Sequence, residues 1–217
     1  MHRKLACLLV LLLTATALSA PRPLKMTLLV PANRSHLREY LGPDTAVIFV
    51  QLASLTDEET ADLLEWVQKG GSLWFSDCRL APRFGMEPAP LDVRVLSATT
   101  LERQPYGGQR HVALLTAVVY AATQHPLVDG LQFERGFLLG ADESHVSTVK
   151  AGGDVVGLMR LTSDPHDPHA DQMAAALRMV GHGSIVFRPV VTDGTFEYNL
   201  KQWVARQYAD PSPTPDH

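Results

Sequence analysis

The chain has 217 residues, of which 46% are hydrophobic and 19% are charged, and its formal net charge at pH 7 is −4. The 19 lysines and arginines form no cluster, which argues against nucleic acid and anionic membrane surfaces as partners. Two cysteines are too few for the disulfide framework of a small exported domain. A chain of this size is long enough to bury a hydrophobic core without such cross-links.

The first residues have the pattern of a secretory signal peptide. Basic residues 2–4 precede an apolar stretch over 5–18. That stretch has about 14 residues, whereas a membrane-spanning helix needs about 20. Small residues favour cleavage after Ser19, because a cut one residue later would place Pro21 directly behind the scissile bond. We therefore expect a secreted or periplasmic protein with no stable membrane span after cleavage, and an uncleaved membrane anchor is the alternative.

Cleavage would leave a chain with 17 basic and 23 acidic residues and with Cys78 as its single cysteine. A lone thiol in an exported protein is buried, reactive or paired with another molecule. We expect one domain over 20–208. The polar, proline-rich end over 209–217 is typical of a disordered tail.

The first half of the domain alternates strands with helices. Apolar runs over 25–30, 45–53 and 72–76 predict strands that are covered on both faces, as in a parallel sheet. A short helical stretch over 33–42 separates the first two runs. This strand and helix order predicts half of a doubly wound α/β sheet.

A longer helix separates the second and third runs. Thr56 followed by Glu59 forms a capping box at its start, and Gly70 is placed to end it. The apolar spacing predicts a buried stripe of Ala61, Leu63, Leu64 and Val67. Trp66 lies outside this stripe, so we expect it to be exposed and able to contact a ligand.

The second half is richer in strands. Three prolines predict a loop over 79–92, and the runs over 93–102 and 111–122 favour strands. The glycine pair within 145–162 indicates a hairpin.

The segment over 172–191 has two interpretations. A hairpin that turns at residues 181–183 is favoured, although the alanine-rich start also suits a helix. A closing helix follows, which Asp193 can cap. Its expected apolar face consists of Phe196, Leu200, Trp203, Val204 and Tyr208.

This arrangement resembles the class I glutamine amidotransferase-like superfamily, and in particular secreted bacterial members that lack the catalytic triad. The segments that carry the resemblance are "LTDEETADLLEWVQKGG", "SLWFSDC", "HPLVDGL", "RMVGHGSIVF" and "YNLKQWV". The resemblance implies a flavodoxin-like three-layer α/β sandwich with a mostly parallel sheet and a C-terminal hairpin plus helix. In catalytic members a cysteine sits on a sharp turn after the third strand, and a later strand end supplies a histidine that an acidic residue holds.

Cys78 occupies the matching position, but its neighbours differ from those of a nucleophile. A nucleophile elbow needs small residues two positions before and two after the nucleophile. Leu80 does not meet this requirement, and Pro82 interrupts the helix that should begin there. Asp77 beside the thiol disfavours the thiolate. The His-x-Glu pattern at a strand end has no match, because His125, His145 and His182 each lack an acidic residue two positions later, so we favour a structural role for Cys78 over a catalytic one.

Two other groups of residues are candidate binding sites. Ligands of open α/β sheets bind outside the carboxyl ends of the strands, where this sequence offers Asn33, Gln51, Asp77 and Arg79. The segment over 164–171 places His166 and His169 among aspartates, a composition that can bind a divalent metal or form a solvated turn.

We therefore expect a binding or interaction module without glutaminase activity and without a cofactor. Its partner is an unidentified ligand, with a carbohydrate and a partner protein as the candidates. The alternatives are a hydrolase that uses Cys78 and a metal-dependent hydrolase that uses the loop over 164–171.

Overall fold

A computed structural model describes residues 25–92, 101–105, 113–117, 119–131, 137–139, 145–188 and 194–209. The predicted signal peptide over 1–19 and residues 210–217 of the predicted tail lie outside these ranges. Within these ranges, none of the helices has the length and apolar character that crossing a membrane requires.

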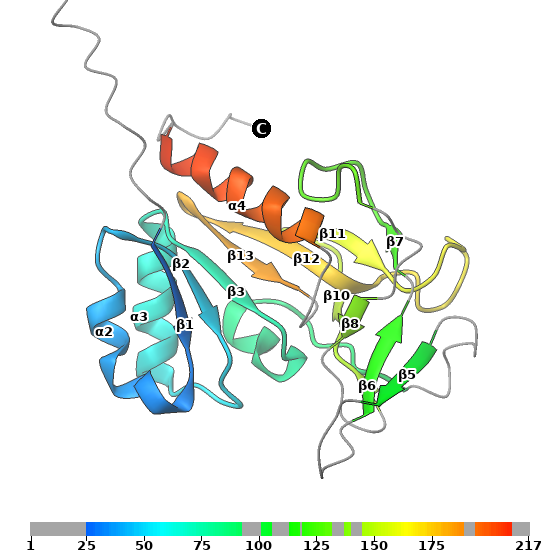
Figure 1. Ribbon diagram of the computed structural model, residues 1–217, viewed down its shortest axis with the longest axis horizontal. Helices are drawn as coiled ribbons and strands as arrows, with labels where there is room; N and C mark the ends of the chain where they lie inside the picture. The colour runs from blue at the N-terminus through cyan, green and yellow to red at the C-terminus, as the bar shows by residue number, and fades with distance from the viewer. Residues whose placement is uncertain are drawn as a thin grey trace, which may run out of the picture.

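One half of the main sheet is parallel. Its strands lie in the order β1, β2, β3, β13, and their bounds are Lys25–Leu29, Thr45–Val50, Ser72–Phe75 and Gly183–Phe187. Each pairs with its neighbour in parallel. Figure 1 shows these strands side by side in the left half of the molecule. The apolar runs that predicted the first three strands are therefore confirmed.

The other half of the sheet is antiparallel. The sheet continues from β13 through β12, β11 and β7, with bounds Gln172–Val180, Val155–Arg160 and Tyr120–Ala121. The short strand β10 (Val149–Lys150) also pairs with β12. The favoured hairpin over 172–191 is confirmed by the pairing of β12 with β13. The sheet is thus mixed, with its parallel strands gathered at one end.

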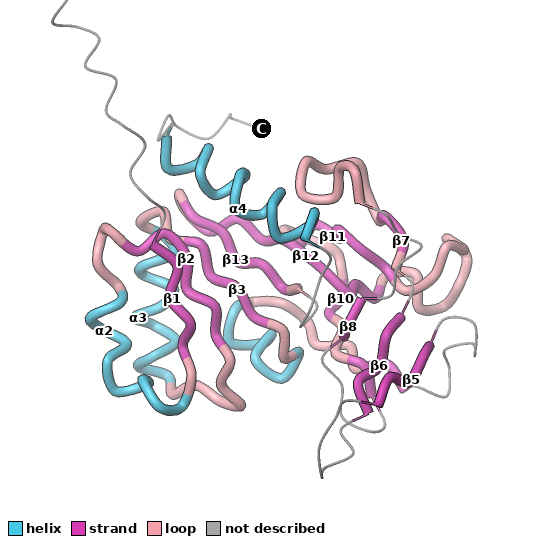
Figure 2. Tube along the Cα trace, viewed as in Figure 1, coloured by secondary structure: helices cyan, strands magenta, loops and turns pink. Residues whose placement is uncertain are grey.

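Two small sheets lie beside the main one. One joins β4 (Leu91–Asp92) to β9 (His145–Val146). The other has the order β5, β6, β8, with bounds Leu101–Pro105, Ala113–Ala117 and Phe137–Leu139. In Figure 2 this end of the molecule consists of strands and loops, whereas the helices gather around the parallel strands.

Helices cover both faces of the parallel strands. One face carries α3 (Asp57–Gln68) and the 3-10 helix η2 (Cys78–Phe84), and the other carries α4 (Gly194–Ala209). The 3-10 helix η1 (Pro31–His36) and α2 (Leu37–Tyr40) connect β1 to β2. The α/β class predicted from the sequence is confirmed, and so is the helix after the hairpin.

Strand residues alternate between the two faces because successive side chains of a strand point in opposite directions. In β3, Leu73 and Phe75 belong to the core beneath α3, whereas Trp74 belongs to the core beneath α4. The predicted face of the last helix is confirmed for Phe196, Leu200 and Val204, which are all fully buried, and Trp203 is partly buried against them. Side-chain burial of Tyr208 and the cap at Asp193 lie outside the described part.

The buried stripe of α3 differs from the prediction. Thr60, Leu63, Trp66 and Val67 are buried, and Ala61 is exposed. The expectation that Trp66 is exposed is wrong, since the side chain retains 6% of its accessible surface. Its ring lies on Gly71, where an added Cβ would come within 2.4 Å of the indole. Gly71 therefore makes room for this indole, a contact that helical spacing alone does not indicate.

Two other local predictions need correction. Residues 78–84 form η2 rather than a loop, because Asp77 caps its start and Gly85, in a left-handed conformation, ends it. The hairpin expected around residues 152–153 is also wrong. Although Gly152 and Val155 form an isolated bridge, β10 and β11 both pair with β12 instead of with each other.

Candidate functional site

The carboxyl ends of the parallel strands meet at one edge of the sheet. The last residues of β2 and β13 both pair with Phe75, the last residue of β3. The loop that begins at Gln51, the segment that begins at Ser76, and Arg188 therefore leave the sheet side by side. This carboxyl edge is where an open α/β sheet binds its ligands, and it includes the four predicted binding residues.

The side-chain amide of Asn33 is hydrogen-bonded to backbone groups at the end of β1. Its Oδ1 accepts a hydrogen bond from the Val30 N–H at 2.9 Å, and its Nδ2 donates to the Leu28 carbonyl oxygen at 2.9 Å. The Leu29 carbonyl oxygen accepts the N–H of Gln51, the residue after β2, so the backbone groups of Leu28 and Val30 point to the free side of β1. The Asn33 amide thus closes part of an edge strand that would otherwise be open to pairing.

Replacing Asn33 with alanine should lower the free energy of unfolding by about 1 kcal/mol, because two backbone groups lose their partner. It should also promote self-association, since Met26 and Leu28 of β1 are already exposed beside that edge. Urea denaturation and light scattering test both effects. Ser35→Ala, an exposed change in the same 3-10 helix, is the matched control; equal behaviour of the two variants would contradict this role.

Asp77 and Arg79 are bound to each other. The Arg79 Nε lies 2.9 and 3.0 Å from the two Asp77 carboxylate oxygens, and Nη2 lies 2.5 Å from Oδ2. Asp77 Oδ1 also accepts the Arg79 backbone N–H at 2.9 Å, which caps η2. The Arg79 side chain is mostly exposed, and a ligand that approaches its Nε or Nη2 must compete with Asp77.

Gln51 differs from these residues because its side chain is exposed and forms no hydrogen bond with the described residues. Its backbone N–H is held by the Leu29 carbonyl at 2.8 Å, which fixes where the side chain leaves the sheet. Of the predicted binding residues, Gln51 therefore has its amide most readily available to a ligand. Ligand binding by all four residues stays a prediction.

Cys78, the first residue of η2, is buried. Its residue exposure is 6%, and it belongs to the core cluster that also contains Leu80 and Phe84. In the part of the chain that the structure describes, its sulfur makes no hydrogen bond, and the thiol is free. The backbone N–H of Cys78 donates to Ser147 Oγ at 3.4 Å. The thiol thus lies among apolar side chains of this core cluster.

The backbone donors beside Cys78 are also occupied. In an elbow enzyme the N–H of the residue after the nucleophile stabilises the oxyanion. Here that residue is Arg79, and its N–H is bonded to the Asp77 carboxylate. Because the Cys78 N–H is bonded to Ser147, both donors are satisfied within the chain. An oxyanion at this position would have to displace a carboxylate.

A histidine and an aspartate nevertheless lie near this segment in the fold. The antiparallel pairing of β4 with β9 places Asp92 opposite His145. Ser147, two residues beyond His145, is the residue that contacts Cys78. The pattern of a histidine with an acidic residue two positions later does not describe this neighbourhood, because the two residues here come from strands far apart in the chain.

Arg188 is a further residue of the carboxyl edge that sequence patterns did not single out. It directly follows β13, and its guanidinium carbon lies 5.0 Å from the Phe49 ring centroid and 5.7 Å from that of Trp74. Burial lowers the pKa of Arg188, and the nearby Glu197 carboxylate opposes that shift. A buried cation on two aromatic faces places positive charge at the end of the parallel strands. The only available signal was an arginine that follows a buried strand.

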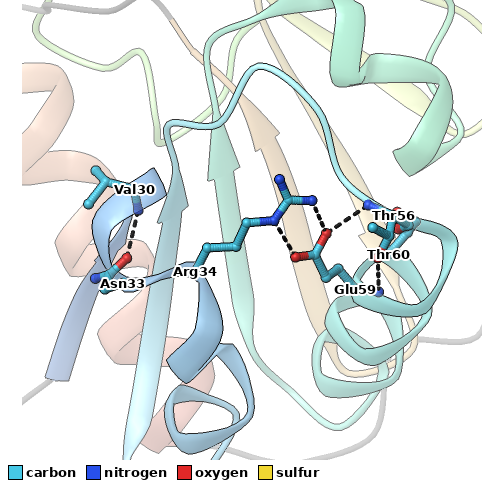
Figure 3. A network of polar contacts seen from close by, with 6 residues as sticks. All are labelled: Val30, Asn33, Arg34, Thr56, Glu59 and Thr60. Atoms are coloured by element: carbon cyan, nitrogen blue, oxygen red, sulfur yellow. Dashed lines mark hydrogen bonds and ion pairs between the residues drawn. The ribbon is translucent and has the colours of Figure 1, made fainter.

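Three arginines fasten the start of α3 to its neighbours. Arg34 of η1 forms a two-pronged pair with Glu59, with distances of 2.5 and 2.6 Å (Figure 3). Glu59 also completes the capping box, since its Oε2 accepts the Thr56 N–H at 2.7 Å. Together, mainly through Arg34, these bonds lower the pKa of Glu59 to about 2. The remaining pairs are Arg38 with Glu58 and Asp62, and Arg83 of η2 with Asp57.

The aspartates of the segment over 164–171 shape its turns. Asp164 Oδ1 accepts the His166 N–H at 2.8 Å, and Asp167 Oδ1 accepts the His169 N–H at 2.7 Å. Each Asp-Pro-His repeat therefore forms a local turn. No group of three or more potential metal ligands was found among the described residues. Metal binding by His166 and His169 stays a prediction.

Comparisons with known proteins give distant structural similarities. No protein-family model and no curated protein matches the chain. A catalytic mutant of Gan42B, a GH42 β-galactosidase from G. stearothermophilus, is 12% identical with a TM-score of 0.49, and unmutated Gan42B is 12% identical with a TM-score of 0.48. Both matches cover 85% of this chain but 30% of the galactosidase. A cytoplasmic protein from Salmonella typhimurium is 11% identical, with a TM-score of 0.43 over 79% of this chain and 73% of its own.

Proposed function

We propose that this chain is a secreted, non-catalytic binding module with a flavodoxin-like, amidotransferase-like architecture. Its ligand, a carbohydrate or a partner protein, binds at the carboxyl edge of the parallel strands. Secretion follows from the signal peptide pattern over 1–19. The mixed surface of this edge suits either ligand, because the exposed Gln51 and the Asp77–Arg79 ion pair follow two neighbouring strands, β2 and β3.

The closed surroundings of Cys78 carry this proposal. A nucleophilic cysteine needs access to substrate, a base and a donor for the oxyanion. Cys78 is 6% exposed, and the N–H groups of Cys78 and Arg79 are bonded to Ser147 and Asp77. These contacts stabilise the turn in a state that does not suit acyl transfer. They support a role in which the edge binds a ligand and leaves it unchanged.

Binding measurements on matched variants test this role. A glycan array, and chemical cross-linking in the medium into which the protein is secreted, identify the ligand. Titration calorimetry then compares the affinities of the variants for it. Gln51→Ala should weaken binding about tenfold or more, as expected for loss of a hydrogen bond at a centre of contact. Cys78→Ala and the distant Lys69→Ala should bind like the parent. Loss of binding in Cys78→Ala alone, with Gln51→Ala unaffected, would contradict the proposal.

The register of Asp92 opposite His145 favours a second candidate, a hydrolase that uses Cys78. In that case His145 would act as the base and Asp92 would orient it. The two candidates differ in hydrolysis of activated ester and amide substrates. The binding module predicts equal background rates for the parent, Cys78→Ala and His145→Ala, whereas the hydrolase predicts loss of turnover in both variants.

A further inference from the structure

The turn over 125–131 positions α4 on the sheet. Asn199 of α4 donates from Nδ2 to the carbonyl oxygens of Leu127 at 3.4 Å and Asp129 at 2.8 Å. The Leu127 side chain is fully buried in the same core cluster as Phe196 and Leu200. The position of α4 on the sheet therefore depends on the conformation of this turn.

His125 stabilises that conformation through its neutral ring. Its Nδ1 accepts a hydrogen bond from the Leu127 N–H at 3.2 Å, and its carbonyl oxygen accepts the Val128 N–H at 2.9 Å. The imidazole packs against Trp203 of α4, with 6.3 Å between ring centroids. Because Nδ1 is the acceptor, the folded turn requires this nitrogen to be unprotonated.

Protonation of His125 would oppose this arrangement. Nδ1 would become a donor and would face the Leu127 N–H donor. Burial lowers the pKa of His125, and the Asp129 carboxylate on the same turn opposes that shift. From α4 the ring meets Trp203, which is uncharged. The stabilisation is therefore complete above the unfolded pKa of about 6.5 and is lost as the pH falls below it.

We propose that the turn over 125–131 is a pH-sensitive support for α4. It keeps the helix packed on the sheet at neutral pH, and it weakens that packing on mild acidification. The change reaches the carboxyl edge because α4 carries Glu197, whose charge acts on Arg188. An exported protein that meets an acidic medium would thereby alter the charge beside its binding edge. This proposal stands independently of the identity of the ligand.

Hydrogen exchange of the whole protein at pH 7.5 and pH 5.5 tests it, with rates corrected for the intrinsic effect of pH. Peptides from α4 should exchange up to about tenfold faster at pH 5.5 relative to peptides from α3, the limit for a histidine with an open-state pKa near 6.5. His125→Asn should abolish the difference, because its Oδ1 can accept the same N–H without titrating. Equal changes in α3 and α4, or a parent-like change in His125→Asn, would overturn the proposal.

Titration of the His125 ring by NMR provides a second measurement that requires no variant. The proposal expects a pKa below 6.5 and a change in the Trp203 signals at the same midpoint. A pKa at or above 6.5 would overturn it, because the folded turn would then favour the protonated ring.

Discussion

Gly183→Ala is expected to lower the free energy of unfolding by about 3 kcal/mol or more, which corresponds to a drop in Tm of roughly 6–12 °C. An added Cβ would lie 2.1 Å from the Val67 carbonyl oxygen and 2.2 Å from that of Gly71. Both are backbone atoms, held at the end of α3 and just before β3. To make room, β13 would have to move away from β3 and weaken their parallel pairing.

Gly42→Ala is the control for this prediction. Nothing lies within 4 Å of an added Cβ at Gly42, and its backbone φ is not positive. We expect a change within about 0.5 kcal/mol for this variant. Urea denaturation followed by circular dichroism measures both. A Gly183→Ala protein within 1 kcal/mol (about a third of the expected loss) of the parent would show that β13 does not approach α3 this closely.

Loss of Glu59 should produce the second-largest effect. Glu59→Gln removes the charge that pairs with Arg34 and should cost about 1 kcal/mol, a value kept modest because the Arg34 side chain is 36% exposed and can return to water. Glu59→Ala also removes the bond to the Thr56 N–H and should cost about 2 kcal/mol. Denaturant unfolding at pH 7 measures both variants.

The effect of Glu59 should depend on pH in a defined direction. The folded pKa of about 2 lies below the ordinary value of 4.5, so the stabilisation is present above pH 4.5 and disappears as the pH falls toward 2. The parent and Glu59→Gln should therefore converge in stability over that range. Glu65→Gln, which breaks an exposed pair with Lys69 on the same helix, should cost less than about 0.5 kcal/mol. A constant gap between the parent and Glu59→Gln down to pH 2.5 would contradict the assigned pair.

The local parts of the fold were predictable because their signals lie within a few residues. The capping box of Thr56 and Glu59, the apolar strands and the turn before Gly183 all follow this rule. The pairing of β10 with β12 and the burial of Trp66 on Gly71 were not predictable in this way. Both depend on contacts between segments whose approach the sequence pattern does not encode.

The sequence predicted the location of the candidate site better than the hydrogen bonds that its residues make. Topology placed Asn33, Gln51, Asp77 and Arg79 at one edge of the sheet, where the structure also has them. It could not indicate that Asn33 is used to close the edge of β1, or that Asp77 binds Arg79. Hydrogen bonds of polar side chains depend on the final backbone geometry. Residue types alone therefore do not distinguish a side chain that binds a ligand from one that stabilises the fold. Arg188 lies at this edge because it follows β13, which pairs with β3.

The rate at which iodoacetamide alkylates Cys78 tests the central claim, that the Cys78 thiol is closed to substrates. The reaction is followed at neutral pH in the folded protein and in urea, and labelled peptides are identified by mass so that Cys7 does not contribute. We predict that the folded protein reacts at least about tenfold more slowly than the unfolded chain, because the thiol is buried. A folded protein in which Cys78 reacts faster than a free thiol would show an accessible, activated nucleophile and would contradict the account.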